Sequence, residues 1–383
     1  MTALKFATRI DKFSEYIFSK LAKAAAEVER ETGRKVLNLG PGSPDIPPSE
    51  VYLHKLSQFI EESGAHLYPG YQAIPEFSQA IAAWYQRRFG VDLSVTEILP
   101  LLGAKDGVSH LPLALFNEGD EVLVPNPGYP AYIAPAQMVN AIPVPYDLFP
   151  ENKFGSMIQN LEMKITNNTK CIWVNFPSNP TGYVASLKGL QQIVDFCKKH
   201  NLILLYDNAY SEITFDGVKA PSILQIPEAR NMAIELGSFS KTFSFAGFRM
   251  GWIVGNTGII MALAKVKSQL DSGLALPLQK LGAYALTHPD KKWQKKMLLS
   301  YENRRNILAV KLKRLGLIFD LPKGSLYIWA KIPDSAIDST EFSMRLLKEK
   351  QILLTPGIAF GSNGDRFVRA SICSNINLID DYV

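Results

Sequence analysis

Cysteine and histidine are scarce in this chain of 383 residues. The three cysteines, Cys171, Cys197 and Cys373, form no CxxC pair, and their odd number leaves no complete disulfide framework. This pattern predicts free thiols in a reducing compartment. Cys171 and Cys197 lie in apolar segments, so we expect both to be buried structural thiols. The five histidines show no metal-ligand spacing, and we expect no metal site.

We also expect neither a signal peptide nor a membrane-spanning segment. The N-terminal segment MTALKFATRIDKF carries charge early and has no apolar core, which argues against a signal peptide. The longest uncharged run, residues 122–146, contains six prolines and cannot form a spanning helix. We therefore expect a cytoplasmic protein.

Charge is neither abundant nor concentrated. Charged residues make up 20% of the chain, the net charge is +5, and no long run of lysine or arginine occurs. These values therefore do not imply a nucleic-acid or membrane partner. A small anionic ligand suits the same balance, and the apolar content of 47% is that of a soluble globular protein.

The N-terminal part contains two helical patterns. Apolar residues recur at three- and four-residue steps through residues 12–32, beginning at Phe13, and Gly33 follows as a stop signal. A short strand at residues 36–40 leads into a loop rich in glycine and proline. Pro75 opens a second helix that Gly90 ends.

From about residue 97, short apolar runs alternate with helical stretches. Strands are predicted near residues 97–102, 121–126, 141–146, 170–176, 202–207, 233–238 and 250–255, with a helix at 104–116 despite Pro112 and another at 187–201. Nearly continuous apolar strands separated by helices indicate an α/β fold with a mostly parallel sheet covered on both faces.

The pattern changes again after about residue 290. A long helix is followed by a predicted strand pair at 317–333, a helix at 339–351, a strand at 352–357 and a last strand at 366–373. Because domains typically hold ~100–200 residues, two domains are expected. We predict a large domain at 46–290 and a smaller α+β domain at 291–383, to which the N-terminal segment 1–45 contributes.

Lys241 follows an apolar strand in the segment LGSFSKTFSFAGFR. Ser238 and Ser240 precede it, and Arg249 comes eight residues later. A neutral lysine amine can form a Schiff base with an aldehyde, and hydroxyls with an arginine suit a phosphate. A surface lysine in a serine-rich loop is the equally weighted alternative.

Asp207 ends another apolar strand. A buried carboxylate there needs a partner, which the protonated ring nitrogen of pyridoxal phosphate would supply. A salt bridge or a helix cap is the alternative. Tyr210 and Asn179 could reach the phenolic oxygen of the same ring, although Asn179 also fits an ordinary Asn-Pro turn.

Three further features suit an anionic, planar ligand. Gly103, Ala104 and Lys105 form a glycine turn at a helix start, where backbone amides can bind an anion. Tyr129 offers an aromatic face, with core packing as the alternative. Arg369 lies in an apolar strand and could hold a substrate carboxylate, or else pair with a local acidic residue.

Three motifs in fixed order, SNPTG, YDNAYSEI and SFSKTFSFAGFRMGW, make the chain resemble the class I/II aminotransferases of the fold-type I pyridoxal-phosphate enzymes over nearly its whole length. The segments HLYPGYQAIPEF, VPNPGYPAY, AKVKSQLDSG and PKGSLYIW are most similar to the LL-diaminopimelate aminotransferase-like subgroup. The resemblance implies amino-group transfer between an amino acid and a 2-oxo acid with ping-pong kinetics, and pyridoxal 5′-phosphate as cofactor.

The resemblance also implies a role for each matching residue. Lys241 is the implied Schiff-base lysine that moves the substrate proton, Asp207 the ring-nitrogen partner and Tyr129 the stacking aromatic. Implied phosphate, phenolate and substrate-carboxylate ligands are Ser238, Ser240, Arg249, Ala104, Lys105, Asn179, Tyr210, Arg369 and Gly42. Tyr68 matches a tyrosine that reaches the phosphate of the other subunit, which implies a homodimer.

Two departures from the subgroup stand out. Residues 246–249 read Ala-Gly-Phe-Arg where the subgroup usually has Thr-Gly-Trp-Arg, and Arg249 is retained. Relatives continue into a closing helix of the small domain, and we expect the small domain at 291–383 to lack it.

Other functions remain open. A carbon–sulfur β-lyase or a decarboxylase could share the fold, and aminotransferase-like domains also occur as ligand sensors in transcription regulators. The sensor reading needs a DNA-binding domain, and no helix-turn-helix pattern precedes the fold. Lys265 and Lys267 could bind an acidic substrate side chain, although a solvated helix face is the favoured reading of both.

Overall fold

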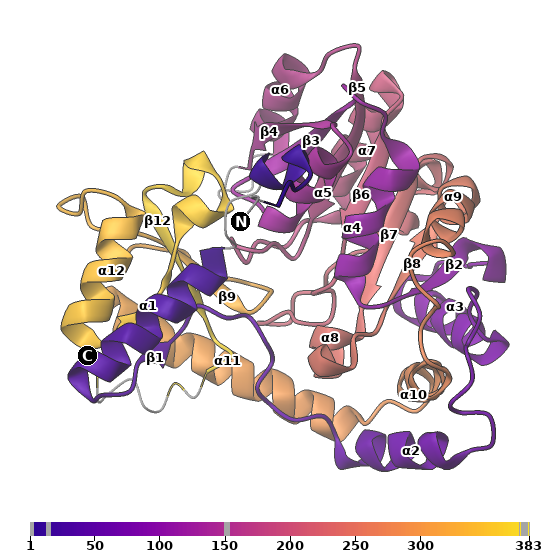
Figure 1. The fold of residues 1–383 in the computed structure, drawn as a ribbon, viewed down its shortest axis with the longest axis horizontal. Helices are drawn as coiled ribbons and strands as arrows, with labels where there is room; N and C mark the ends of the chain where they lie inside the picture. Colours follow the sequence, from indigo (N-terminus) through magenta and orange to yellow (C-terminus); the bar gives the residue numbers. More distant parts are fainter. Residues whose placement is uncertain (1–3, 13–16, 149–153, 375, 377–381, 383) are drawn as a thin grey trace.

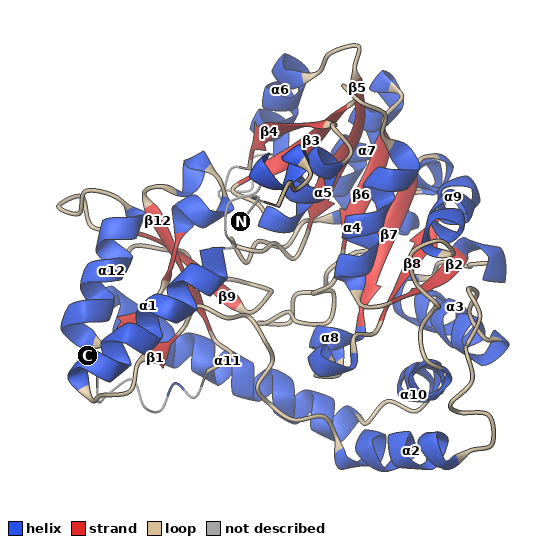
Figure 2. Cartoon of the chain, viewed as in Figure 1, coloured by secondary structure: helices blue, strands red, loops and turns tan. Residues whose placement is uncertain are grey.

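The computed structural model describes residues 4–12, 17–148, 154–374, 376 and 382. In that part of the chain, every helix is too short or too polar to cross a bilayer. Figures 1 and 2 show a large sheet with helices on both sides and a second, smaller group of strands and helices beside it. The long helix α11 (Lys291–Arg314) runs between the two groups.

The large sheet has seven strands in the order β2-β8-β7-β6-β5-β3-β4. Pairing is parallel from β4 through β7, and β8 is antiparallel to both of its neighbours. The predicted mostly parallel sheet is thus confirmed. The strands are β2 (Ile98–Leu101), β3 (Glu121–Asn126), β4 (Ile142–Asp147), β5 (Thr169–Asn175), β6 (Ile203–Asp207), β7 (Ala233–Ser238) and β8 (Gly251–Gly255).

Both faces of this sheet are buried, because successive strand residues alternate between two apolar cores. Along β5, Cys171 and Trp173 face one core, whereas Ile172 and Val174 face the other. Helices α4 and α9 pack on the first face, and α3, α6, α7 and α10 on the second. The helices are α2 (Glu50–Glu61), α3 (Pro75–Phe89), α4 (Ala104–Leu115), α5 (Ile133–Met138), α6 (Phe154–Lys164), α7 (Leu187–His200), α8 (Phe239–Thr242), α9 (Thr257–Lys267) and α10 (Leu276–Thr287).

The N-terminal segment pairs directly with the C-terminal part. β1 (Leu37–Asn38) is parallel to β10 (Ile352–Leu353), and β9, β11 and β12 form a three-stranded antiparallel sheet. The remaining elements are α1 (Ile17–Thr32), β9 (Tyr327–Lys331), α12 (Ser339–Lys350), β11 (Thr355–Pro356) and β12 (Phe367–Ser371). The domain boundaries at residues 45 and 290 remain predictions.

Several predicted elements are confirmed. The helix at Pro75 ends at Gly90, which adopts the left-handed conformation (φ 68°) that favours glycine. Helix α4 accommodates Pro112 in its interior. Helix α1 is described from Ile17, so Phe13 lies outside the described residues.

The predicted strand pair at residues 317–333 is confirmed only in part. Its second half is strand β9, but its first half meets β9 at a single bridge, between Ile318 and Lys331, and makes another isolated bridge from Gly324 to Thr214. The residues that follow bond elsewhere, since the Lys323 carbonyl accepts from Phe215 N–H and Ser325 N–H donates to the Ile213 carbonyl. Strand β9 pairs along its whole length with β12.

The single strand predicted at residues 352–357 is also divided. Ile352 and Leu353 pair with β1, whereas Thr355 and Pro356 pair with β12 in a different sheet. The segment thus changes from one pairing strand to another after Leu353, and an apolar run in the sequence does not show where such a change occurs.

Candidate active site

A cavity of about 360 Å³ lies at the carboxyl edge of the large sheet. Three neighbouring strands, β5, β6 and β7, end in polar residues that line it: Asn175, Asp207 and Ser238. Tyr327 and Arg369 line it from β9 and β12 of the smaller group of strands. The volume lies within the ~300–1,000 Å³ typical of small-molecule sites, and the position is where parallel α/β sheets bind ligands.

Lys241 lies in the short helix α8 directly after β7. Its Nζ donates a hydrogen bond to the Gly42 carbonyl at 2.6 Å. Burial lowers the pKa of Lys241 to about 8, and the nearby Arg369 and Arg249 act in the same direction. With that pKa, about a tenth of the amine is neutral at pH 7, compared with well under a thousandth for an ordinary lysine. The pocket therefore supplies the neutral amine that nucleophilic chemistry needs.

Gly42 brings the N-terminal loop against the opposite wall of the cavity. A Cβ at this position would overlap the hydroxyl of Tyr327, so only glycine fits. The same hydroxyl lies 3.0 Å from that of Tyr210. The loop, β9 and the segment after β6 thereby meet at one point beside Lys241.

Asp207 is buried at the end of β6, and both of its carboxylate oxygens accept hydrogen bonds. Tyr132 donates to Oδ2 at 2.8 Å, and the amide of Ala209 donates to Oδ1 at 3.2 Å. Burial raises the pKa of Asp207, while the Tyr132 hydroxyl and the Ala209 amide oppose that rise. The carboxylate is thus held in a fixed orientation at the cavity wall, where a cationic ligand atom could pair with it.

Tyr132 is itself held in place by stacking. Its ring lies on that of Trp173 at 4.7 Å between centroids and an interplanar angle of 11°. Tyr129, three residues earlier, contacts Tyr132 edge to face and lines the cavity.

Hydroxyl, amide and guanidinium donors gather at one end of the cavity. Ser238 and Ser240 line it, and Ser238 Oγ accepts from the Ser240 amide at 3.1 Å. Arg249 donates to the Ala246 carbonyl at 2.9 Å and to the Leu102 carbonyl at 3.4 Å. Ala104 begins helix α4 and lines the cavity next to them. Such a set suits a phosphate or another anion.

Arg369 is 2% exposed and also lines the cavity. It donates to Asn179 Oδ1 at 2.8 Å and to the Gly40 carbonyl at 2.6 Å, while its Nε has no partner among the described residues. The rings of Tyr327 and Phe360 lie 4.0 and 4.6 Å from the guanidinium carbon. The described residues offer it no carboxylate, so its charge is available to an anionic ligand.

The structure places most of the predicted residues around this one cavity. Those that line it are Gly42, Ala104, Lys105, Tyr129, Asn179, Asp207, Tyr210, Ser238, Ser240, Lys241, Arg249 and Arg369. Gly103 caps α4 just behind the lining, and Tyr68 is 87% exposed and lies outside it. Residues not predicted as ligands include Phe18, Asn175, Tyr132 and Tyr327. Asn175 was detectable, because it ends a buried strand as Asp207 does.

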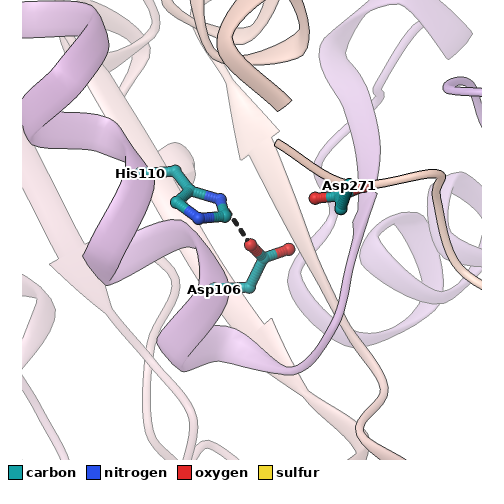
Figure 3. Close-up of side chains that lie close together, drawn as sticks. All are labelled: Asp106, His110 and Asp271. Carbon is teal, nitrogen blue, oxygen red and sulfur yellow. Dashed lines mark ion pairs between the residues drawn. The ribbon is translucent and has the colours of Figure 1, made fainter. Parts of the chain in front are cut away.

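Lys267 does not lie on a solvated helix face, as the sequence suggested. Its side chain is 4% exposed, and its Nζ lies 2.5 Å from Asp106 Oδ2 and 2.6 Å from Asp271 Oδ2. His110 Nδ1 lies 2.6 Å from the other oxygen of Asp106 (Figure 3). Asp106, His110 and Asp271 are close enough together to hold a metal ion, but the lysine ammonium already compensates the two carboxylates.

The chain is similar to known proteins over nearly its whole length. Residues 34–380 match the family described as aminotransferase class I and II. The chain is 37% identical over 375 residues to the LL-diaminopimelate aminotransferase of Dehalococcoides mccartyi strain CBDB1, a match that covers 96% of this chain and 95% of the relative.

Solved structures are similar over the same extent. An aminotransferase from Staphylococcus aureus superposes with a TM-score of 0.86 at 30% identity, covering 98% of this chain and 96% of that one. An aspartate aminotransferase from Rhizobium meliloti gives a TM-score of 0.93 at 26% identity, covering 99% of this chain and 97% of that one.

Proposed function

The chain belongs to the class I and II aminotransferases and transfers amino groups between amino acids and 2-oxo acids, and we propose that it does so with pyridoxal 5′-phosphate bound at Lys241. The observation that carries this proposal is the pairing of two unusual groups in one cavity. Lys241 has a lowered pKa, and the buried carboxylate of Asp207 lines the same cavity. Lysine and aspartate so arranged match an aldehyde and a protonated ring nitrogen.

The residues present fit this cofactor. Ser238, Ser240, Arg249 and the start of α4 form an anion site at one end of the cavity, and Asp207 lies on the wall. Tyr129 provides an aromatic face for a planar ring. Asn179 and Tyr210 offer a donor amide and a hydroxyl that could hold the phenolic oxygen.

When bound, the cofactor supplies an aldehyde that condenses with amines and a ring that withdraws electrons from the substrate Cα. Lys241 would hold the cofactor covalently through its neutral Nζ. The same amine, when free, would be placed to act as the general base that moves the proton of the substrate Cα. Asp207 would keep the ring nitrogen protonated, and Arg369 would orient the substrate through its α-carboxylate.

We also propose that the enzyme is a homodimer in which Tyr68 completes the partner's phosphate site. Tyr68 is 87% exposed, and Leu67 and Leu270 are exposed at 59% and 53%. Exposed apolar residues of this kind suit an interface. In mixed dimers, a Tyr68→Ala subunit and a Lys241→Ala subunit should together restore about one active site. Mixed dimers that form without regaining activity would contradict a shared site.

The substrate pair is best determined by a panel. LL-diaminopimelate comes first because the relatives that match most of the chain carry that name. Aspartate and aromatic amino acids follow, each assayed against 2-oxoglutarate and pyruvate. Stoichiometric 2-oxo acid formation from the donor with ping-pong kinetics supports the proposal. Release of ammonia with pyruvate, or of carbon dioxide, would instead indicate a lyase or a decarboxylase.

A further inference from the structure

Lys267 is a buried cation away from the reaction centre that contacts two separate parts of the chain. It is the last residue of α9, and its Nζ bridges Asp106 of α4 and Asp271 of the following loop. A buried ammonium is costly unless it is paired. Two carboxylates at 2.5 and 2.6 Å meet that need and fix the ammonium between them.

One side of this bridge fixes the start of α4. Asp106 Oδ2 accepts from the Leu102 amide at 2.9 Å, and its Oδ1 lies 2.6 Å from His110 Nδ1. Leu102 stands two residues before Ala104, where the helix begins and where the chain meets the anion-binding end of the cavity. The position of the Leu102 amide, and of the start of α4 that follows it, therefore depends on the Asp106 carboxylate that Lys267 holds.

The other side fixes the turn that follows Tyr68. Asp271 Oδ1 accepts from the Gly273 amide at 2.8 Å. Gly273 lies so close to the Gly70 carbonyl that any side chain there would overlap it, and its Cβ position is 3.2 Å from Pro69. Pro69 and Gly70 directly follow Tyr68. The same ammonium is thus connected, through Asp271 and Gly273, to the segment that presents Tyr68.

We infer that Lys267 is a positioning residue for two phosphate sites at once: one part of the site in its own subunit and one part of the site in the partner. Through Asp106 it sets the amides of its own subunit's site, and through Asp271 it sets the turn that carries Tyr68 toward the partner's site. This inference rests on the proposed function and the proposed dimer. It assigns to Lys267 no contact with the cofactor or substrate.

The test compares two aldehydes that differ only in the phosphate. Cofactor-free dimers of the unchanged enzyme and of Lys267→Met are titrated with pyridoxal phosphate and with pyridoxal, following absorbance. Lys267→Met should weaken the binding of pyridoxal phosphate about tenfold or more, which is the size of effect seen when a residue that supports a directly bound group is removed. The affinity for pyridoxal should change by no more than about twofold. The matched control is Lys265→Met, which removes an exposed lysine of the same helix.

Equal weakening of both aldehydes would show a general structural role, and no change in either would show no role; both results overturn the inference. Because Lys267→Met leaves two carboxylates unpaired, the charge-reduced variant Lys267→Met/Asp271→Asn repeats the test if the first does not fold. It should show the same phosphate-selective loss. Failure of the unchanged enzyme to bind pyridoxal phosphate would instead refute the proposed function itself.

A mixed dimer separates the two halves. One subunit carries Lys241→Ala together with Lys267→Met, and its partner is unchanged, so the intact Lys241 site receives its Tyr68 from the altered subunit. Its affinity for pyridoxal phosphate should fall relative to a mixed dimer with Lys241→Ala alone. Equal affinities would remove the part of the inference that reaches across the dimer.

Discussion

Replacing Tyr132 by phenylalanine tests how the protein holds Asp207. The change removes one O–H donor from a buried carboxylate and keeps the ring that stacks on Trp173. A hydrogen bond to a charged group contributes ~1.5–3 kcal/mol, which corresponds to roughly 1–2 pKa units at 1.36 kcal/mol per unit. Because the Tyr132 hydroxyl lowers the pKa of Asp207 against the effect of burial, removing it should raise that pKa further.

A higher pKa of Asp207 moves the proton from the cofactor's ring nitrogen toward the carboxylate. The ¹⁵N chemical shift of ring-labelled pyridoxal phosphate, followed against pH, should show deprotonation of the nitrogen at lower pH in Tyr132→Phe, with a fall in turnover of about tenfold or more. Tyr146→Phe is the control, because it removes a buried hydroxyl that, among the described residues, donates to the Trp173 carbonyl and not to Asp207. An unchanged nitrogen titration in Tyr132→Phe would refute this reading of the hydrogen bond.

Three further changes test other parts of the site and the fold. Arg369→Ala should lower kcat/KM for every amino acid, because all share the α-carboxylate, and the loss of transition-state stabilisation should be about 2–5 kcal/mol. A loss confined to dicarboxylic substrates would place Arg369 at the side-chain pocket. In the cofactor-free enzyme, the rate of aldehyde capture should rise with pH up to about 8, the pKa of Lys241; a rise that continues toward pH 10 would show an ordinary lysine. Asp216→Ala should destabilise the protein by roughly 3 kcal/mol in urea unfolding at pH 7, because it leaves Arg305 buried without its bidentate partner. Arg305 and Lys323 lower the pKa of Asp216, so its contribution is complete above about pH 4 and declines progressively as pH falls from there toward the lowered pKa of the folded state; a difference between variant and parent that does not shrink between about pH 4 and about pH 2 would contradict the ion pair.

The large sheet could be predicted because its strands are short, apolar and bounded by turn residues. The run from Thr169 to Asn175 is typical, since every residue from Cys171 onward is buried. Strand ends also located the chemistry: Asp207, Ser238 and Lys241 were found because polar residues directly follow buried strands. These inferences depend only on local pattern and on the rule that parallel strands end at one edge.

Elements whose identity depends on distant partners were harder to predict. Residues 317–326 have an apolar pattern typical of a strand, but Lys323 and Ser325 bond to Phe215 and Ile213, far away in the sequence. Helix α2 was not among the predicted elements, although its apolar residues recur at helical spacing; of these residues only Tyr52 is buried. For residues 317–326, tertiary contacts that local periodicity does not encode decide the structure.

The same limit explains two residues whose roles could not be predicted. Lys267 looks like a surface lysine in its own helix, and only Asp106 and Asp271 make its burial possible. Tyr132 reads as core packing, because its link to Asp207 joins residues 75 positions apart. In both cases, the role of the side chain depends on a partner that the fold supplies.

The central claim is that Lys241 holds pyridoxal phosphate, and one measurement tests it directly. The purified protein, loaded with pyridoxal phosphate, is treated with borohydride, digested and mapped by mass spectrometry, with Lys241→Ala and Lys265→Met as matched variants. We predict a yellow protein in which reduction fixes one pyridoxyl group per chain, on Lys241, in the parent and in Lys265→Met but not in Lys241→Ala. A label on another lysine of the parent, or no label at all, would contradict the account.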